Sequence, residues 1–157
     1  MKTKLFFILI FFFISNHLFS QNISIPDANF EQALIDLGWD TNGLNGNILE
    51  SEAIVIDSLK IGNPLANELT PNVLAKNVNL KSLFVNDNQL TTIDVSNNTT
   101  LERFGIMRNQ FTSIDVSTLL NIKDLFIHGN QLTSIDLTKN VNLVTLQAYD
   151  NLLSTLD

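Results

Sequence analysis

Apolar and polar positions recur with a fixed 21-residue period over the second half of this chain. The strings NDNQLTTIDVS, MRNQFTSIDVS and HGNQLTSIDLT begin at Asn86, Met107 and His128. The same step connects three apolar columns and one asparagine column, which are Leu80, Leu101, Ile122 and Leu143; Leu83, Phe104, Leu125 and Leu146; Val85, Ile106, Ile127 and Ala148; and Asn88, Asn109, Asn130 and Asn151. Self-similarity at a fixed period of this length predicts a solenoid, in which each turn packs only on its neighbours.

One short strand is expected in each turn. Around Leu83 and Val85 the alternation has period two, so these side chains should face inward. Ser82, Phe84 and Asn86 should then face outward. Strands of successive turns would pair about 4.8 Å apart, as a parallel sheet along one face.

Two polar columns have structural explanations. A buried amide is costly unless its hydrogen bonds are made, so the asparagine column is expected to bind backbone groups of its own and adjacent turns. Asp94, Asp115, Asp136 and Asp157 follow the same period. We expect each of these carboxylates to accept hydrogen bonds from backbone amides at a bend, as in an Asx turn.

The segment before the repeats, residues 21–53, predicts an N-terminal cap. Asp27 is a suitable helix N-cap, apolar residues follow at helical spacing and Gly38 provides a stop, so we expect a helix over residues 28–37. Terminal units of a solenoid must shield the first layer of core from water. Residues 54–77 are then a degenerate first repeat, and residues 78–157 hold four 21-residue repeats, the last incomplete.

Residues 40–52 are similar to the calcium-binding loop of an EF-hand, one residue out of register. With Gly46 as the sixth position, Asn45 and Glu52 occupy ligand positions, whereas Asp40 and Asn42 fit only if one residue is treated as an insertion. A weak calcium site and a loop that only turns the chain both remain open, because Asn and Gly make turns without a metal. The sequence suggests no other cofactor.

The N-terminus indicates export. Lys2 and Lys4 precede an apolar run over residues 5–14, which would rise only about 15 Å as a helix, half of a bilayer core. Residues 1–20 are therefore predicted to be a signal peptide, with no membrane insertion after its removal. Loss of its two lysines takes the formal net charge from −7 to −9, which disfavours nucleic acid as a partner. The chain has no cysteine, so it must be stabilised by packing.

Each repeat has the order apolar, two others, apolar, one other, apolar, two others, Asn, as in LKSLFVNDN, LERFGIMRN, IKDLFIHGN and LVTLQAYDN. This order resembles the leucine-rich repeat in the short, internalin-like form of secreted bacterial proteins, strongly over residues 78–157 and loosely over 54–77. The resemblance implies an α+β repeat solenoid, a right-handed coil with a parallel sheet on one face and an N-terminal capping helix. It also implies a protein that is secreted or held at the cell surface.

Recognition is expected at the outward positions that vary, because the framework positions are structural. Aromatic residues, Met and Arg on an exposed face are typical of binding patches. The candidate contact residues are Phe84, Arg103, Met107, Arg108, Phe126, His128 and Tyr149. Outside the predicted signal peptide His128 is the only histidine, so no second His or Cys is available to join it as a metal ligand.

No nucleophile elbow, phosphate loop or zinc spacing is found, so the chain is predicted not to be an enzyme. The leading hypothesis is an exported module whose sheet face binds a protein or a surface glycan. The alternatives are a passive spacer at the cell surface and the N-terminal fragment of a larger secreted protein or enzyme. The sequence stops within a repeat and without a closing cap, so we expect either that the natural product continues beyond Asp157 or that this chain is a truncated gene product.

Overall fold

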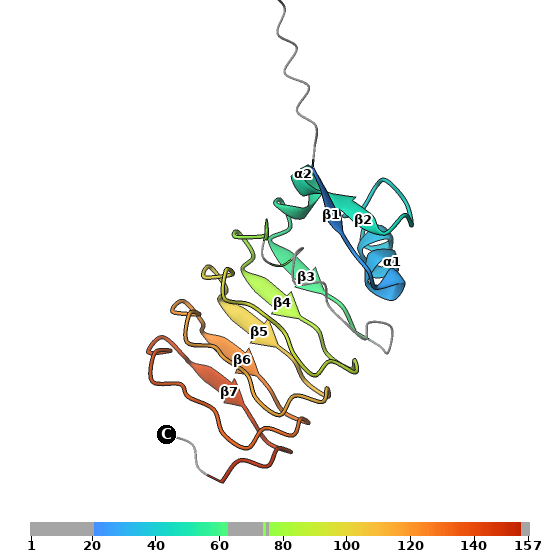
Figure 1. Cartoon of the computed structure of the whole chain (residues 1–157). Coiled ribbons are helices and arrows are strands. Elements are labelled where there is room, and N and C mark those ends of the chain that lie inside the picture. The colour runs from blue at the N-terminus through green and yellow to red at the C-terminus, as the bar shows by residue number, and fades with distance from the viewer. Residues whose placement is uncertain (1–20, 63–73, 75, 155–157) are drawn as a thin grey trace, which may run out of the picture.

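Each repeat of the sequence forms one turn of a solenoid, and the turns stack in chain order (Figure 1). The structure is a computed structural model that describes residues 21–62, 74 and 76–154. Five short strands form one parallel sheet: β3 (Ser58–Lys60), β4 (Ser82–Phe84), β5 (Arg103–Gly105), β6 (Asp124–Phe126) and β7 (Thr145–Gln147). The predicted solenoid with a parallel sheet on one face is therefore confirmed.

The sheet register keeps equivalent repeat positions side by side. Leu83 pairs with Phe104, and Leu125 with Leu146, so each pairing joins the same position of two successive repeats. The first pairing is different, because Leu59 pairs with Leu83 across a longer stretch of chain. β3 therefore joins the same sheet, and three more residues separate it from the next strand than separate the later strands from one another.

Inward side chains of successive turns form one continuous apolar core. The fully buried residues of the sheet side include Leu83, Val85, Phe104, Ile106, Leu125 and Ile127. Leu90, Phe111 and Leu132 fill the interior from the return path. Leu146 and Ala148 of the last described turn are only partly buried, because no further described turn packs on them.

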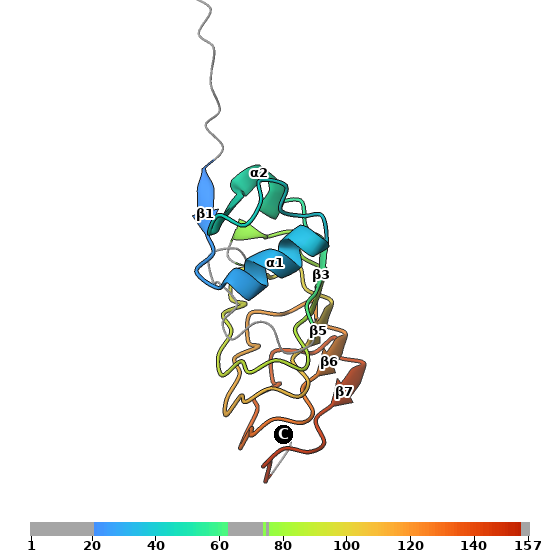
Figure 2. The same cartoon turned by 90° about the vertical axis from the view of Figure 1, so that its right-hand side faces the viewer.

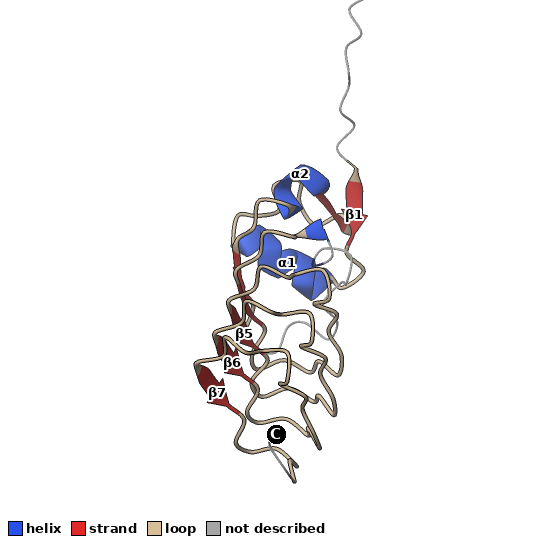
Figure 3. Cartoon of the chain, turned by 90° about the vertical axis from the view of Figure 1, so that its left-hand side faces the viewer, coloured by secondary structure: helices blue, strands red, loops and turns tan. Residues whose placement is uncertain are grey.

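A small cap lies at the N-terminal end of the solenoid (Figures 2 and 3). It contains α1 (Ala28–Asp36), α2 (Glu50–Ala53) and an antiparallel pair, β1 (Asn22–Ser24) and β2 (Asn47–Leu49). Phe30 and Leu34 of α1 are completely buried and belong to the same apolar cluster as Leu59. The cap therefore extends the core of the first turn.

The ends of α1 follow from its capping residues. The Asp27 carboxylate accepts hydrogen bonds from the backbone N–H groups of Asn29 and Phe30, at 2.8 and 3.1 Å. The helix is one residue shorter than the sequence predicts, since Leu37 is its C-cap and the chain turns at Gly38, where φ is +75°. Leu37 is consequently 47% exposed and lies outside the buried stripe.

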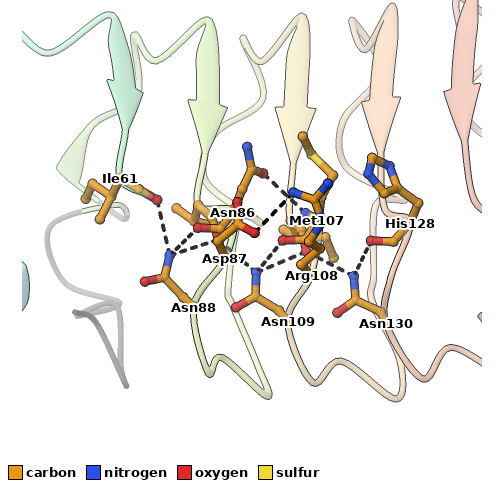
Figure 4. Close-up of polar contacts among 11 residues, drawn as sticks. Ile61, Asn86, Asp87, Asn88, Met107, Arg108, Asn109, His128 and Asn130 are labelled. Carbon is orange, nitrogen blue, oxygen red and sulfur yellow. Dashed lines mark hydrogen bonds and ion pairs between the residues drawn. The ribbon is translucent and has the colours of Figure 1, made fainter. Parts of the chain in front are cut away.

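The asparagines that follow the strands tie neighbouring turns together (Figure 4). Asn109 Nδ2 donates to the carbonyl of Val85 in the preceding turn at 2.8 Å and to that of Ile106 in its own turn at 3.0 Å. Its Oδ1 accepts from the N–H of Leu90 at 3.0 Å. Asn130 repeats this arrangement one turn later. Each of these side chains therefore satisfies backbone groups on the sheet side and on the return path.

A second asparagine column lies on the return path and was not recognised from the sequence. Asn98 Nδ2 donates to the carbonyls of Leu74 and Asn77, and Asn140 Nδ2 donates to those of Val116 and Leu119. The column is interrupted by an apolar residue, Leu119, which occupies the equivalent position in the intervening turn. This break concealed the periodicity of the column.

The aspartate column makes the expected bends. Asp94, Asp115 and Asp136 each accept a hydrogen bond of 2.9 Å from the backbone N–H two residues later. Asp157 lies outside the described residues, as does the predicted signal peptide. Within the described part of the chain, no helix has the length and apolar character needed to cross a membrane.

Candidate functional site

The outward side of the sheet brings three of the predicted contact residues into one cluster. The rings of Phe84 and Phe126 have centroids 5.8 Å apart, and their planes are tilted by 35°. The guanidinium carbon of Arg103 lies 5.3 Å from the centroid of the Phe84 ring, in a cation–π arrangement. Three successive strands, β4, β5 and β6, therefore contribute to the same surface.

A glycine makes the contact between the two rings possible. Gly105 pairs with Phe84 on one side and with Phe126 on the other, so the two phenylalanines stand two strands apart, about 9.6 Å between backbones. A Cβ atom at this position would lie 2.5 Å from Phe84 Cδ1 and 3.0 Å from Met107 Sδ. The rings meet because no side chain at Gly105 separates them.

A hollow of about 330 Å³ opens beside this cluster. We call it the β3–β5 hollow; its lining residues are Ser58, Lys60, Ser82, Phe84, Asn86, Arg103 and Met107. Asn86 is held in place because its Oδ1 accepts the backbone N–H of Met107 at 3.2 Å (Figure 4). The hollow thus combines an aromatic ring, a thioether, two cations and several small polar groups.

Lys60 and Ser58 also belong to this surface, although the 21-residue period did not predict them. Lys60 pairs with Phe84 in the sheet and therefore lies in the same outward column. The signal was present in the similarity between SLKI, from Ser58, and SLFV, from Ser82. It was overlooked because these two strings are three positions further apart than the equivalent strings of the regular repeats.

His128 and Tyr149 form a separate pair nearer to β7. Their rings are stacked, with centroids 4.3 Å apart and planes 13° from parallel. His128 is only 7% exposed, whereas Tyr149 is 57% exposed. Burial lowers the pKa of His128, and the positive charge of Arg108 lowers it further. The sequence places His128 on the outward face, and the structure puts Tyr149 between this ring and the solvent.

Arg108 lies at the edge of the face and is part of an ion pair. Its Nη1 is 3.1 Å from Asp87 Oδ1, and both side chains are largely exposed. Both residues have left-handed backbone conformations, with φ of 51° for Arg108 and 55° for Asp87. Gly129, at the equivalent position of the next repeat, has φ of 68°. Asp87, Arg108 and Gly129 therefore each lie at a tight bend that follows a strand.

The loop of residues 40–52 is organised around a carboxylate outside the loop, that of Glu31. Glu31 Oε1 accepts backbone N–H groups from Asn45, Gly46 and Asn47, at 2.8, 2.6 and 3.0 Å. Glu31 is 1% exposed, so it joins α1 to the loop from inside the cap. Glu31 belongs to the helix that precedes this loop, and no short motif connects the two segments.

The four predicted calcium ligands have protein partners in this loop. The Asn45 amide donates to Asn42 Oδ1 at 2.8 Å, and Asp40 Oδ1 accepts the N–H of Asn42 at 3.1 Å. Glu52 accepts hydrogen bonds from the Thr41 hydroxyl and from the N–H of Leu49. Burial raises the pKa of Asp40, with smaller contributions from the nearby carboxylates. Among the described residues, no group of three or more His, Cys, Asp or Glu side chains is placed to hold a metal.

Comparison with protein-family models and with curated proteins finds no match. Solved structures do match. The functional domain of InlJ from Listeria monocytogenes superimposes with a TM-score of 0.77 at 27% identity, covering 88% of this chain and 31% of that one. An internalin, InlF, from Listeria monocytogenes gives a TM-score of 0.63 at 20% identity, covering 84% and 46%.

This chain spans less than half of the length of either protein. The InlJ domain includes a cysteine ladder, whereas this chain has no cysteine and uses asparagine columns between its turns. The repeat pattern, the parallel sheet and the structural matches agree. The chain is therefore an internalin-like leucine-rich repeat solenoid.

Proposed function

We propose that this chain is an exported, non-catalytic module that binds a protein partner through the outward face of its sheet. The observation that carries the proposal is the cluster of Phe84, Arg103 and Phe126 beside the β3–β5 hollow. Aromatic and Arg side chains dominate the binding energy of protein interfaces. The likeness to internalins supports a binding role for the solenoid.

The geometry favours a preformed contact surface. Phe84 contacts both the Arg103 guanidinium and the Phe126 ring, so it loses little conformational freedom when a partner binds. Sheet hydrogen bonds on both sides of Gly105 fix the backbone beneath this cluster. The charged and apolar N-terminus of the sequence supports export, and the partner is then a protein outside the cytoplasm.

Affinity capture with matched variants tests this proposal. Phe84→Ser combined with Phe126→Ser removes the aromatic contacts, and Leu120→Ser removes an apolar side chain that is 53% exposed and lies on the return path. We expect an extracellular partner to be captured by the wild type and by Leu120→Ser, and to be lost with the double variant. Equal capture by all three proteins, with unchanged thermal melts, would show that the sheet face does not bind.

A further inference from the structure

The β3–β5 hollow carries two positive side chains, of which Arg103 has a long ion pair, 3.6 Å to Asp124, and Lys60 has none among the described residues. Elsewhere in the described chain, Lys76, Lys123 and Arg108 each have a carboxylate oxygen within 3.1 Å. Lys60, which lines the hollow, is exposed and has no ion pair among the described residues. The chain as a whole, in contrast, has a formal net charge of −7. The hollow is therefore a basic spot on an acidic protein.

Arg103 adds directed donors to this spot. Its Nε lies 3.6 Å from Asp124 Oδ2, a distance that is too long for a good hydrogen bond. The terminal guanidinium nitrogens have no hydrogen-bond partner in the part of the chain that the structure describes. Because the Phe84 ring packs against the guanidinium, these donors are presented in a restricted orientation.

We propose that the β3–β5 hollow receives the carboxylate of an aspartate or glutamate on the protein partner, with an adjacent apolar side chain of that partner against Phe84 and Met107. This inference rests on the proposed function, since it names the group that the binding face takes. Lys60 and Arg103 supply charge-assisted hydrogen bonds to the carboxylate. The Phe84 ring and the thioether side chain of Met107 supply the apolar wall.

Charge and shape both favour an acidic peptide over other anions. Nucleic acid would be repelled by the net negative charge of the chain. A sugar ring would need an open aromatic face, but Arg103 covers a face of Phe84 and Phe126 packs in tilted contact with the same ring. A peptide side chain needs only the ring edge, and a hollow of about 330 Å³ has room for one acidic side chain with its apolar neighbour.

The direct test is a titration followed by NMR chemical shifts. The probes are a blocked four-residue peptide with a glutamate beside a leucine, and its counterpart in which glutamine replaces the glutamate. Sodium glucuronate serves as the acidic sugar. We expect the glutamate peptide to shift the backbone signals of Lys60, Phe84 and Arg103, with an effect that weakens as salt is added. The glutamine peptide should bind about tenfold more weakly, the equivalent of one charge-assisted hydrogen bond.

Two variants separate the charge from its position. Lys60→Glu reverses the basic charge in the hollow, and Lys139→Glu makes the same change on an exposed part of the return path. Binding of the glutamate peptide should fall about tenfold or more in Lys60→Glu and change less than about twofold in Lys139→Glu. Gly105→Ala provides a third variant, because its Cβ would displace the Phe84 ring without changing any charge. It should also weaken binding.

Three results would overturn the inference. The first is the absence of chemical-shift changes in the hollow up to about 10 mM peptide, because weaker binding would not matter. The second is equal binding of the glutamate and glutamine peptides, and the third is chemical-shift changes in the hollow with glucuronate but with neither peptide.

Failure of this inference is distinguishable from failure of the proposed function. If partner capture is lost with the Phe84→Ser, Phe126→Ser double variant but retained with Lys60→Glu, the face binds without the carboxylate contact. If both variants retain capture, both proposals fail.

Discussion

The ring of Tyr149 lies flat on the imidazole of His128, with centroids 4.3 Å apart. These residues occupy the same position in two successive repeats. The stacking explains why His128 is buried although its position faces outward. The exposed residue of the pair is Tyr149, so any contact with a partner at this end of the face would be made mainly by the tyrosine.

Removal of Tyr149 should change the titration of His128. Burial lowers the pKa of His128 below its ordinary 6.5, so the unfolded chain takes up this proton at a higher pH than the folded chain does. The stabilising effect of the neutral, buried ring is complete above pH 6.5 and is lost as the pH falls toward the folded-state pKa. We expect Tyr149→Ala to raise the pKa of His128, measured by NMR of the ring protons, and to reduce the loss of stability on acidification.

The control for this prediction is His128→Gln. This variant should remove the component of the pH dependence that begins near 6.5, as measured by urea unfolding at several pH values. A wild-type pKa at or above 6.5 would contradict the buried, stacked arrangement.

Removal of one buried asparagine from the column that follows the strands should lower the free energy of unfolding more than removal of an exposed asparagine. Asn109→Ala leaves the buried N–H of Leu90 without its acceptor. It also removes one of the two asparagine donors to each of the carbonyls of Val85 and Ile106, which keep their bonds to Asn88 and Asn130. We expect a loss of about 2–4 kcal/mol in unfolding free energy, because the unsatisfied buried N–H costs about 1–3 kcal/mol and the two lost hydrogen bonds add about 0.5–1.5 kcal/mol each. Asn121→Ala, which removes one exposed hydrogen bond to Thr99, should cost below about 1 kcal/mol. Similar losses of unfolding free energy in both variants would show that the asparagine column has no special structural role.

Glu31 should be the most sensitive polar residue of the cap. Glu31→Ala deprives three backbone N–H groups of their shared acceptor, and we expect a loss of about 2–4 kcal/mol in thermal or urea unfolding. Asp36→Ala, on the exposed side of α1, should cost below about 1 kcal/mol. A Glu31→Ala protein as stable as the wild type would mean that the loop is not anchored by this carboxylate.

Thermal melts with and without millimolar calcium test the predicted loop site. We expect no rise in Tm, because the side chains of Asn42, Asn45 and Glu52 already have protein partners and backbone donors surround Glu31. A calcium-dependent rise in Tm that disappears in Asp40→Asn would establish a calcium site and refute this expectation.

The aspartate bends should make stability sensitive to strong acid. Backbone N–H groups lower the pKa of Asp94 and Asp115 below the ordinary 3.8, and the Thr138 hydroxyl and N–H lower that of Asp136. Their stabilising contribution is present above pH 3.8 and is lost as the pH falls through the folded-state values. Replacement of all three by Asn should reduce the dependence of the unfolding free energy on pH below about 3.8. Carboxyl chemical shifts titrating at the ordinary value would refute the depressed pKa.

The repeats of the fold could be predicted because each turn buries apolar side chains at equivalent positions. Leu83 and Val85 are inward and Phe84 is outward, as the period-two pattern predicts. Periodicity assigns a residue to a side of the sheet but does not say what covers it there, and His128 is buried for this reason. The Phe84–Phe126 contact depends on the glycine between them, which is an effect of side-chain volume and not of pattern.

The cap and the first turn were less predictable because their contacts are not repeated. Lys60 was missed since its turn is three residues longer than the others. Glu31 was missed because its partners are supplied by a different loop, and only the folded chain brings them together.

Within the described part of the chain, side-chain hydrogen bonds of the asparagine columns to earlier turns span 19–27 residues. Because each of these bonds joins a turn only to itself or to its neighbour, folding that begins in one part of the stack can propagate from turn to turn. Because these bonds join only neighbouring turns, a whole repeat can also be added to or removed from the chain. A gene that gains or loses the codons of one repeat gains or loses one layer and keeps every remaining strand in phase, so unequal recombination can lengthen or shorten the binding surface without redesigning the fold.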